Sequence, residues 1–189
     1  MSKKVEFFYD YVSLYSYLAD TQLRQRFGDA VTYRPIFLGA VMEATGNRPP
    51  GTVEAKGRYM RADARRWAER YGVPLEWNPV FPQLTVKALR MALVALHRGQ
   101  LDAVHEPLFA AMWVEQKDLS DDAVIAAIGE PAGISLEDIG EAAIKEELKA
   151  NTAEAVQRGV FGAPTFFVGD EMFFGNDRFD FVEEALGRS

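Results

Sequence analysis

The spacing of apolar residues along the chain changes near residue 12. The run Val5–Tyr9 is short, aromatic and branched, which predicts a buried β-strand. Beyond it, apolar positions recur at helical spacing on one face: Leu14, Tyr17, Leu18 and Thr21. This pattern predicts a helix that ends near Phe27, with Gly28 as its C-cap. Ser13 and Ser16 therefore lie in the first turn of a helix that directly follows a strand.

A second strand pattern covers residues 30–38 and should pair with the first strand in a parallel β-α-β unit. Pro35 has no amide hydrogen to donate, so we expect it at a sheet edge or at the end of this strand. From residue 39 to about residue 150 the pattern is helical throughout. Helices are predicted up to Tyr71, from Phe81-Pro82 through a buried apolar run to His97, through 104–112, over Asp121–Ile128, and from Ser135, with a capping-box-like Asp138, to about Asn151.

Strand character returns after residue 164. The apolar runs Phe166–Val168 and Met172–Phe174 predict two strands, and the Gly-Asp pair between them suits a two-residue hairpin turn. A last helix is expected directly after Asp177. The chain therefore ends on a β-β-α unit.

The predicted order is β-α-β, a helical block, then β-β-α. This order predicts an α/β protein with a thioredoxin fold, which carries a large all-helical insertion between its βαβ and ββα halves. We assign residues 1–38 and 152–189 to the thioredoxin-like domain and residues 39–151 to the helical insertion domain. A chain of 189 residues has room for both in one continuous molecule.

Composition narrows the chemistry that Ser13 and Ser16 can carry. Their spacing is that of the cysteine pair in redox proteins with a thioredoxin layout. This chain has no cysteine and two histidines, so an intrinsic dithiol, a disulfide framework and thiolate metal ligation are excluded, and we expect no metal site. The net charge of −7 argues against nucleic acid as the main partner.

Neither a membrane span nor a signal peptide is expected. No apolar run approaches the roughly 20 residues that cross a bilayer. The lysines at Lys3 and Lys4 are not followed by the apolar region of about 7–15 residues that a signal peptide needs. We therefore expect a cytoplasmic protein without a membrane partner.

Two groups of polar residues allow more than one interpretation. Arg61, Arg65 and Arg66 line one side of the predicted helix that follows Lys56, and such a face is ordinarily solvated. Alternatively, Lys56 and its neighbours hold the carboxylate of an acidic ligand. His97 and His105 are expected to have structural roles.

A thioredoxin layout places the turn at Pro164 opposite the start of the first helix. Proline in that turn is commonly cis, so we predict a cis Ala163–Pro164 bond, with the backbone of Ala163 free to pair with a peptide-like ligand as an added strand would. Asn176 and Asp177 precede the last helix. They either bind the α-amino-acid end of a ligand or only cap that helix.

A family resemblance is carried by four segments, which occur in one order along the whole chain: Phe8–Leu18, Gly46–Pro50, Phe161–Thr165 and Phe174–Arg178. Together they closely resemble the 2-hydroxychromene-2-carboxylate isomerase family, which is similar to kappa-class glutathione transferases and, more distantly, to DsbA-like oxidoreductases. The first segment is fairly specific, whereas the Ala-Pro-Thr segment marks only the wider thioredoxin superfamily. The family usually has proline where this chain has Leu14, so the loop in this chain lacks one fixed φ angle.

The resemblance implies a glutathione-dependent isomerase of the 2-hydroxychromene-2-carboxylate or trans-o-hydroxybenzylidenepyruvate type, acting in aromatic-compound degradation. Its cofactor is glutathione, its substrate is a small aromatic carboxylate, and the family is typically homodimeric. Ser13 is the implied catalytic residue, which hydrogen-bonds the sulfur of glutathione and keeps it as thiolate. The implied glutathione-binding residues are Ser13, Tyr15, Asn47, Lys56, Ala163, Pro164, Asn176 and Asp177.

The physical chemistry of the first segment agrees with this implication. A chain that has a thiolate-stabilising site but no cysteine must receive its sulfur from outside. A hydroxyl donor and a helix N-terminus together lower the pKa of a thiol. Two alternatives stay open: a kappa-like glutathione transferase, whose product keeps the sulfur, and a non-catalytic thioredoxin-superfamily protein that binds a peptide at the Pro164 turn.

Overall fold

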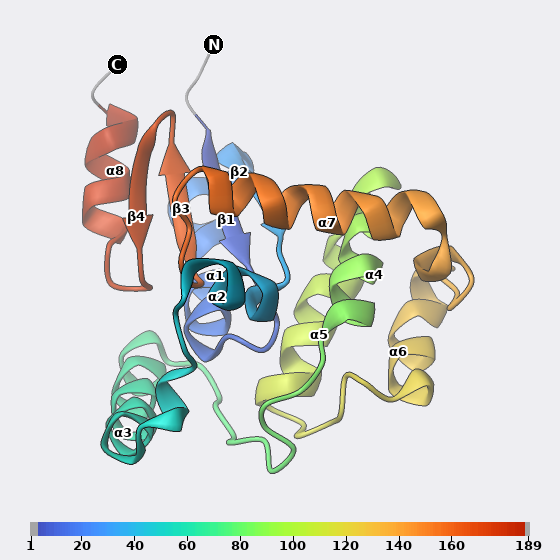
Figure 1. Cartoon of the computed structure of the whole chain (residues 1–189), viewed down its shortest axis with the longest axis horizontal. Coiled ribbons are helices and arrows are strands. Elements are labelled where there is room, and N and C mark those ends of the chain that lie inside the picture. The colour runs from blue at the N-terminus through green and yellow to red at the C-terminus, as the bar shows by residue number, and fades with distance from the viewer. Residues whose placement is uncertain (1–3, 188–189) are drawn as a thin grey trace.

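The fold is built on a mixed sheet of four strands in the order β2-β1-β3-β4 (Figure 1). The computed structural model describes residues 4–187. β1 pairs in parallel with β2 and antiparallel with β3, which pairs antiparallel with β4. The strands are β1 (Val5–Tyr9), β2 (Val31–Pro35), β3 (Thr165–Val168) and β4 (Glu171–Phe174).

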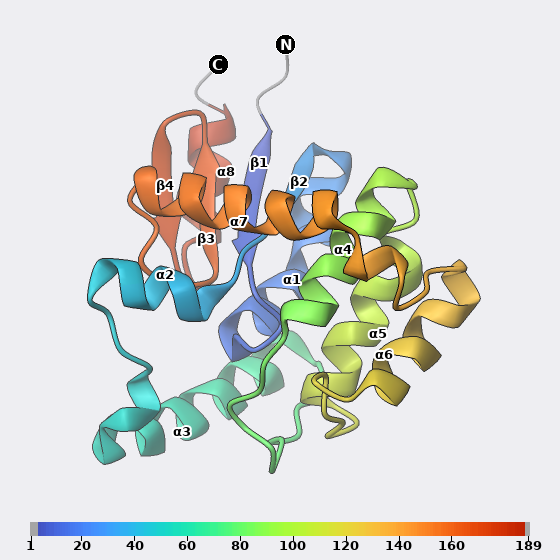
Figure 2. The ribbon, with the colours of Figure 1, turned by 45° about the vertical axis from the view of Figure 1, so that its right-hand side comes forward.

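The described part of the chain has eight α-helices. They are α1 (Leu14–Phe27), α2 (Leu38–Thr45), α3 (Glu54–Tyr71), α4 (Val86–His97), α5 (Asp102–Trp113), α6 (Asp122–Gly129), α7 (Ala142–Gln157) and α8 (Phe179–Gly187). α4, α5 and α6 stand beside the sheet, and α7 crosses in front of it (Figures 1 and 2). The chain thus has the predicted thioredoxin-like fold with a helical insertion between the two halves of the sheet.

Alternate side chains of β1 pack on the two faces of the sheet. Phe7 stacks on Phe166 with ring centroids 5.2 Å apart, on the face that α1 and α8 cover. Phe8 meets Phe167 edge-on at 5.5 Å, on the face that residues of α2 and α7 cover. Because β1 is central and covered on both faces, its carboxyl end is a rigid support for the loop that leads to Ser13.

Several element ends agree with the predictions. α1 ends at Gly28, which has a φ of 52° and donates its amide hydrogen to the carbonyl of Arg24. Pro35 is the last residue of β2, an edge strand, where its missing amide hydrogen leaves no ladder bond unmade. Gly169, with a φ of 62°, lies in the hairpin turn between β3 and β4.

The second strand is shorter than its apolar pattern suggests. It ends at Pro35, and Leu38 begins α2. The amide of Phe37 donates to the hydroxyl of Thr152 on α7, at 3.0 Å, and the amide of Leu38 donates to the carboxylate of Asp10, at 2.9 Å. These side-chain acceptors replace the strand ladder, and they turn the chain into a helix.

The prediction that Phe81 and Pro82 open a helix is wrong. They form a loop with a cis peptide bond, and α4 begins at Val86. Thr85, at the N-cap position, turns its side chain to Asp10 instead of to its own helix. The helix itself is as buried as predicted, because all but one of the residues from Ala88 to Ala95 are buried.

The predicted helix from Ser135 to about Asn151 is also wrong at both ends. Ser135 and Asp138 do exchange the hydrogen bonds of a capping box, at 2.7 and 3.1 Å, but they cap only a short 3₁₀ turn. α7 begins at Ala142 and continues to Gln157. The proposed domain division between residues 151 and 152 therefore falls inside one helix, and that division stays a prediction.

No helix among residues 4–187 combines the length and the apolar character needed to cross a membrane.

Candidate functional site

The start of α1 is built by Ser13, which caps the helix rather than forming part of its first turn. Its backbone is extended, and its Oγ accepts the amide hydrogen of Ser16 at 3.1 Å. The amide groups of Leu14 and Tyr15 have no hydrogen-bond acceptor among the described residues. Because the positive end of the helix dipole lies there as well, this point of the chain can hold an anion.

The hydroxyl of Ser13 donates its hydrogen to the carbonyl oxygen of Ala163, at 2.8 Å. The Ala163–Pro164 bond is cis, which confirms the prediction. The amide of Ala163 has no partner within residues 4–187. The start of α1 and the Pro164 turn, which the sequence predicted to face each other, thus meet at Ser13. Rotation of the Ser13 hydroxyl would redirect its hydrogen from Ala163 to a ligand.

Asp10 fixes the backbone around Ser13 through its side-chain hydrogen bonds. Its carboxylate is fully buried and accepts the amides of Val12 (3.1 Å) and Leu38 (2.9 Å) and the hydroxyl of Thr85. Burial raises the pKa of Asp10, while these donors act against the rise. One carboxylate therefore ties together the loop before Ser13, the start of α2 and the start of α4.

A cavity of about 780 Å³ opens beside Ser13. This volume lies within the roughly 300–1,000 Å³ typical of small-molecule sites. The cavity is bounded by the starts of α1 and α2, the linker after α2, one face of α3, the 81–84 loop and the segments 162–164 and 174–178. All eight predicted site residues line it: Ser13, Tyr15, Asn47, Lys56, Ala163, Pro164, Asn176 and Asp177. Their binding roles stay predictions.

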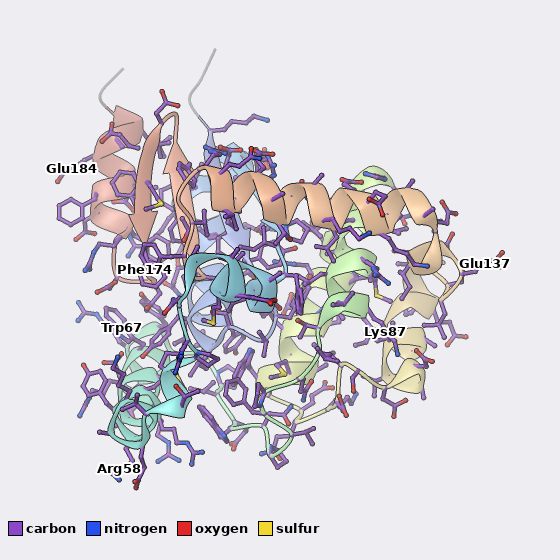
Figure 3. The ribbon with its side chains drawn as sticks, in the orientation of Figure 1. Arg58, Trp67, Lys87, Glu137, Phe174 and Glu184 are labelled. Carbon is purple, nitrogen blue, oxygen red and sulfur yellow. The ribbon has the colours of Figure 1, made fainter. Side chains whose placement is uncertain are left out.

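One face of α3 lines the cavity through residues at helical spacing: Lys56, Met60, Asp63 and Trp67. Figure 3 shows Trp67 on this helix and Phe174 at the end of β4, two aromatic side chains that both border the cavity. The arginines of α3 point elsewhere. Arg61 lies over the ring of Trp77, at 4.5 Å, and Arg65 and Arg66 are exposed. The solvated interpretation therefore fits the arginines, while Lys56 lies on the cavity wall.

Tyr15 and Asp63 form a polar pair on this wall. The hydroxyl of Tyr15 donates to Asp63 at 2.9 Å, and Tyr59 donates to the other oxygen at 3.3 Å. Burial and the Asp63 carboxylate raise the pKa of Tyr15, so its hydroxyl keeps its hydrogen at neutral pH. The sequence interpretation missed Asp63, although its helical spacing from Lys56 was a usable signal.

Asn47 anchors the linker after α2. Its side-chain amide donates to the carbonyl of Phe161 at 2.8 Å, and its side-chain oxygen accepts the amide of Arg48 at 2.8 Å. The linker is thereby tied to the segment just before the cis-proline turn. Asn47 shapes the cavity wall whether or not it also touches a ligand.

Asn176 and Asp177 are held beside the cis-proline turn, because Gly175 donates its amide to the carbonyl of Pro164 at 3.0 Å. Asn176 is buried, and its own carbonyl accepts the hydroxyl of Tyr71 at 3.0 Å. The first backbone hydrogen bond of α8 goes to the carbonyl of Arg178. Arg178 therefore occupies the N-cap position, and Asp177 lies outside the helix with its carboxylate 2.6 Å from the Arg178 guanidinium.

Both histidines lie away from the cavity. His105 is buried between the hydroxyl of Tyr11, at 2.8 Å, and the carboxylate of Asp20, at 3.0 Å. His97, at the end of α4, pairs with Glu147 at 2.9 Å. Within residues 4–187, no three His, Asp or Glu side chains are grouped so as to hold a metal ion.

Comparison with known proteins places this architecture in a family. Residues 4–187 match the family model of the DSBA-like thioredoxin domain. The chain is 36% identical to the 2-hydroxychromene-2-carboxylate isomerase of Sphingobium xenophagum, over 98% of this chain and 99% of that protein. It is 30% identical to glutathione S-transferase kappa 1 of Caenorhabditis elegans, over 97% of this chain and 90% of that protein.

A solved structure of a 2-hydroxychromene-2-carboxylate isomerase superimposes on the chain with a TM-score of 0.84 and 31% identity, covering 97% of this chain and 94% of that one. The match covers nearly the whole chain, so the similarity includes the helical insertion as well as the thioredoxin-like part. The chain belongs to the DSBA-like thioredoxin family, together with the 2-hydroxychromene-2-carboxylate isomerases and the kappa-class glutathione transferases.

Proposed function

We propose that this protein is a glutathione-dependent isomerase that acts on small aromatic carboxylates of the 2-hydroxychromene-2-carboxylate or trans-o-hydroxybenzylidenepyruvate type, in the breakdown of aromatic compounds. The observation that carries the proposal is the set of unpaired donors at the start of α1, next to a cis-proline turn, in a chain that has no cysteine. The names of its relatives point to the same chemistry.

The donors around the cavity fit a tripeptide thiol. The amide of Ala163 lacks a partner among the described residues and is available to the cysteinyl backbone of the ligand. Lys56 has no ion pair within residues 4–187 and suits a ligand carboxylate, while Asp177 suits the γ-glutamyl ammonium. Tyr15, Asn47, Pro164 and Asn176 complete the surface on which the ligand lies.

Glutathione, when bound, supplies a nucleophilic sulfur that can add to an electron-poor double bond and leave again unchanged. The chain's own part is to keep that sulfur ionised. The Ser13 hydroxyl and the amides of Leu14 and Tyr15 favour the charged form, because each can donate a hydrogen bond at the positive end of α1. Phe37, Phe81 and other apolar side chains of the cavity exclude water from the sulfur.

Ser13→Ala tests this role, with Ser16→Ala as its matched control. Loss of one hydrogen bond to a charged group costs roughly 1.5–3 kcal/mol, so isomerase turnover at neutral pH should fall about 10- to 100-fold and recover partly at higher pH. Ser16 should matter little, because its buried hydroxyl has no partner among the described residues. Equal turnover of Ser13→Ala and the unsubstituted protein at saturating glutathione would exclude the role assigned to Ser13.

A kappa-like glutathione transferase is the second candidate, favoured by the relatives that carry that name. The two activities would use the same site and differ in whether the released product still carries glutathione. Isomerase turnover leaves total glutathione unchanged, whereas conjugation consumes one glutathione for each product. Product analysis therefore separates them, and absence of any glutathione binding in calorimetry would favour a non-catalytic peptide-binding role instead.

A homodimer and a cytoplasmic location are further parts of the proposal. The cytosol maintains glutathione in its reduced form, which is the form the site needs. Light scattering of the purified chain measures the oligomeric state, and fractionation of expressing cells measures the location.

A further inference from the structure

The walls of the cavity differ in charge. Its carboxylates, Asp63 and Asp177, come from α3 and from the segment after β4. A second wall is formed by the loop before α1, by α2 and by the 81–84 loop, and most of its side chains are apolar: Val12, Phe37, Leu38, Met42, Phe81 and Leu84. Gln83 is the polar side chain of this wall, and both ends of its amide group already bond to the backbone of Lys117 and Leu119. The proposed glutathione site draws on the charged wall. The apolar wall has no ligand assigned to it.

Three cationic side chains line the cavity, and they differ in their partners. Arg178 is paired with Asp177 at 2.6 Å. Lys56 belongs to the proposed glutathione site. Arg48 forms no ion pair and no side-chain hydrogen bond with any residue from 4 to 187. Arg48 is therefore the cationic side chain of this cavity that has neither a partner among the described residues nor a role in the proposed glutathione site.

The backbone of Arg48 is nevertheless fixed. Its amide donates to the side-chain oxygen of Asn47, whose own amide group donates to the carbonyl of Phe161. Pro49 follows, and its ring fixes its own φ angle, which is −53°. Figure 2 shows this linker running from α2, which contributes to the apolar wall, down to α3, which contributes to the charged wall. An anchored backbone, on the linker between α2 and α3, thus carries a guanidinium that lines the cavity and has no partner among residues 4–187.

We propose that Arg48 binds the carboxylate of the second substrate, whose ring lies on the apolar wall formed by α2 and the 81–84 loop. This inference rests on the proposed function and names the residue that selects the substrate. A guanidinium matches a carboxylate with two parallel hydrogen bonds, and an apolar wall matches an unsaturated ring system. The protein should then prefer electrophiles that carry a carboxylate over neutral ones of the same shape.

Binding of two unreactive probes tests the inference. Cinnamate and cinnamamide share a flat ring and an alkene, and only cinnamate carries a charge. Calorimetry is performed on three glutathione-loaded proteins: the unsubstituted protein, Arg48→Met and Arg48→Lys. Arg48→Lys keeps the positive charge but cannot make the two parallel hydrogen bonds of a guanidinium. Arg48→Met should weaken cinnamate binding roughly 10- to 100-fold, Arg48→Lys should weaken it less, and cinnamamide should bind all three proteins equally.

Glutathione affinity of the same variants separates this inference from the proposed function. Unchanged glutathione affinity in Arg48→Met, together with lost cinnamate affinity, supports the assignment. If Arg48→Met weakens glutathione and spares cinnamate, Arg48 holds a carboxylate of glutathione and the inference is wrong. Cinnamate that binds Arg48→Met as well as the unsubstituted protein, or binds neither, also overturns it. Failure of the unsubstituted protein to bind glutathione contradicts the proposed function instead, and cinnamate binding without glutathione still tests Arg48.

Discussion

At the scale of single residues, the candidate site depends on a few backbone and hydroxyl groups. Ser13 alone accepts one hydrogen bond from Ser16 and donates another to Ala163. Residue types and local spacing made Ser13 and Pro164 predictable. Asp10 and Asp63 were not predictable. An acidic residue after a strand or on a helix is expected to be exposed to solvent until the elements packed around it are known.

Leu14 gives this site a donor that a proline would lack. It occupies the first position of α1, where proline is well tolerated, and the extended backbone of Ser13 is also suited to precede a proline. Leu14→Pro should therefore keep the helix while removing one amide hydrogen. If that hydrogen reaches the bound sulfur, its loss should raise the pKa of the glutathione thiol by about 1 to 2. The ultraviolet absorbance of the thiolate, titrated against pH, measures this pKa.

The control for this substitution is Leu14→Ala. It also removes the buried Leu14 side chain, but it keeps the amide hydrogen. A pKa that rises in Leu14→Pro and not in Leu14→Ala assigns the effect to the amide. The same pKa in both variants would mean that the amide of Leu14 does not contact the sulfur.

At the scale of elements, periodicity predicted helices better than it predicted where they begin. α1 and the β3–β4 hairpin follow from local sequence, since their ends carry glycines with positive φ angles. The loop before α4 could not be predicted in the same way. Thr85 ends that loop by donating to Asp10, a residue 75 positions earlier in the chain. A partner so distant leaves no mark in a local pattern.

Asp10→Asn tests how strongly these elements depend on one carboxylate. An asparagine in this place turns an NH₂ group toward at least one of the donors, so a buried amide or hydroxyl loses its acceptor. We expect a loss of about 1–3 kcal/mol in the free energy of unfolding at pH 7, measured by urea denaturation. Thr85→Val, which removes one donor and leaves the carboxylate, should cost less. Equal stability of Asp10→Asn and the unsubstituted protein would show that the hydrogen bonds to the Asp10 carboxylate are not needed for stability.

The pH dependence of this loss has a defined sign. Burial raises the pKa of Asp10 above its value in the unfolded chain, so the folded protein binds this proton more readily. Stability contributed by that proton is present below about pH 4 and is lost as the pH rises through the raised pKa. The deficit of Asp10→Asn should therefore be largest in acid and shrink toward neutral pH. A deficit that grows with pH would mean that the pKa of Asp10 is lowered, not raised, on folding.

At the scale of the whole molecule, the cavity joins segments from both ends of the chain. Ser13 follows the first strand of the sheet, Ala163 precedes the third, and Lys56 comes from the helical insertion between them. The order of elements was enough to predict this architecture, because a thioredoxin layout brings the start of α1 and the proline turn together. The side-chain pairing inside the cavity depends on how α3 packs, and the buried residues of α3 are two alanines, Ala64 and Ala68.

A ligand that touches all of these segments should stabilise the whole fold, and Asp177→Asn tests one of its contacts. Without ligand we expect near-normal melting, because α8 starts at Phe179 with Arg178 at its N-cap position, and the exposed Asp177–Arg178 pair contributes at most about 1 kcal/mol. Glutathione at 100 times its Kd should stabilise the unsubstituted protein by about 2.7 kcal/mol. If Asp177 pairs with the γ-glutamyl ammonium, a tenfold weaker Kd removes about 1.4 kcal/mol of this gain at the same concentration.

Asp180→Asn is the matched control, since Asp180 lies in the first turn of α8 and does not line the cavity. Melting curves with and without glutathione, together with calorimetry, give both quantities for each protein. A weaker Kd confined to Asp177→Asn assigns the carboxylate to the ligand. Lower stability without ligand, at unchanged glutathione affinity, would instead return Asp177 to a structural role. The γ-glutamyl end of glutathione would then need another anchor, and the buried side chain of Asn176, which lines the same cavity, could provide it.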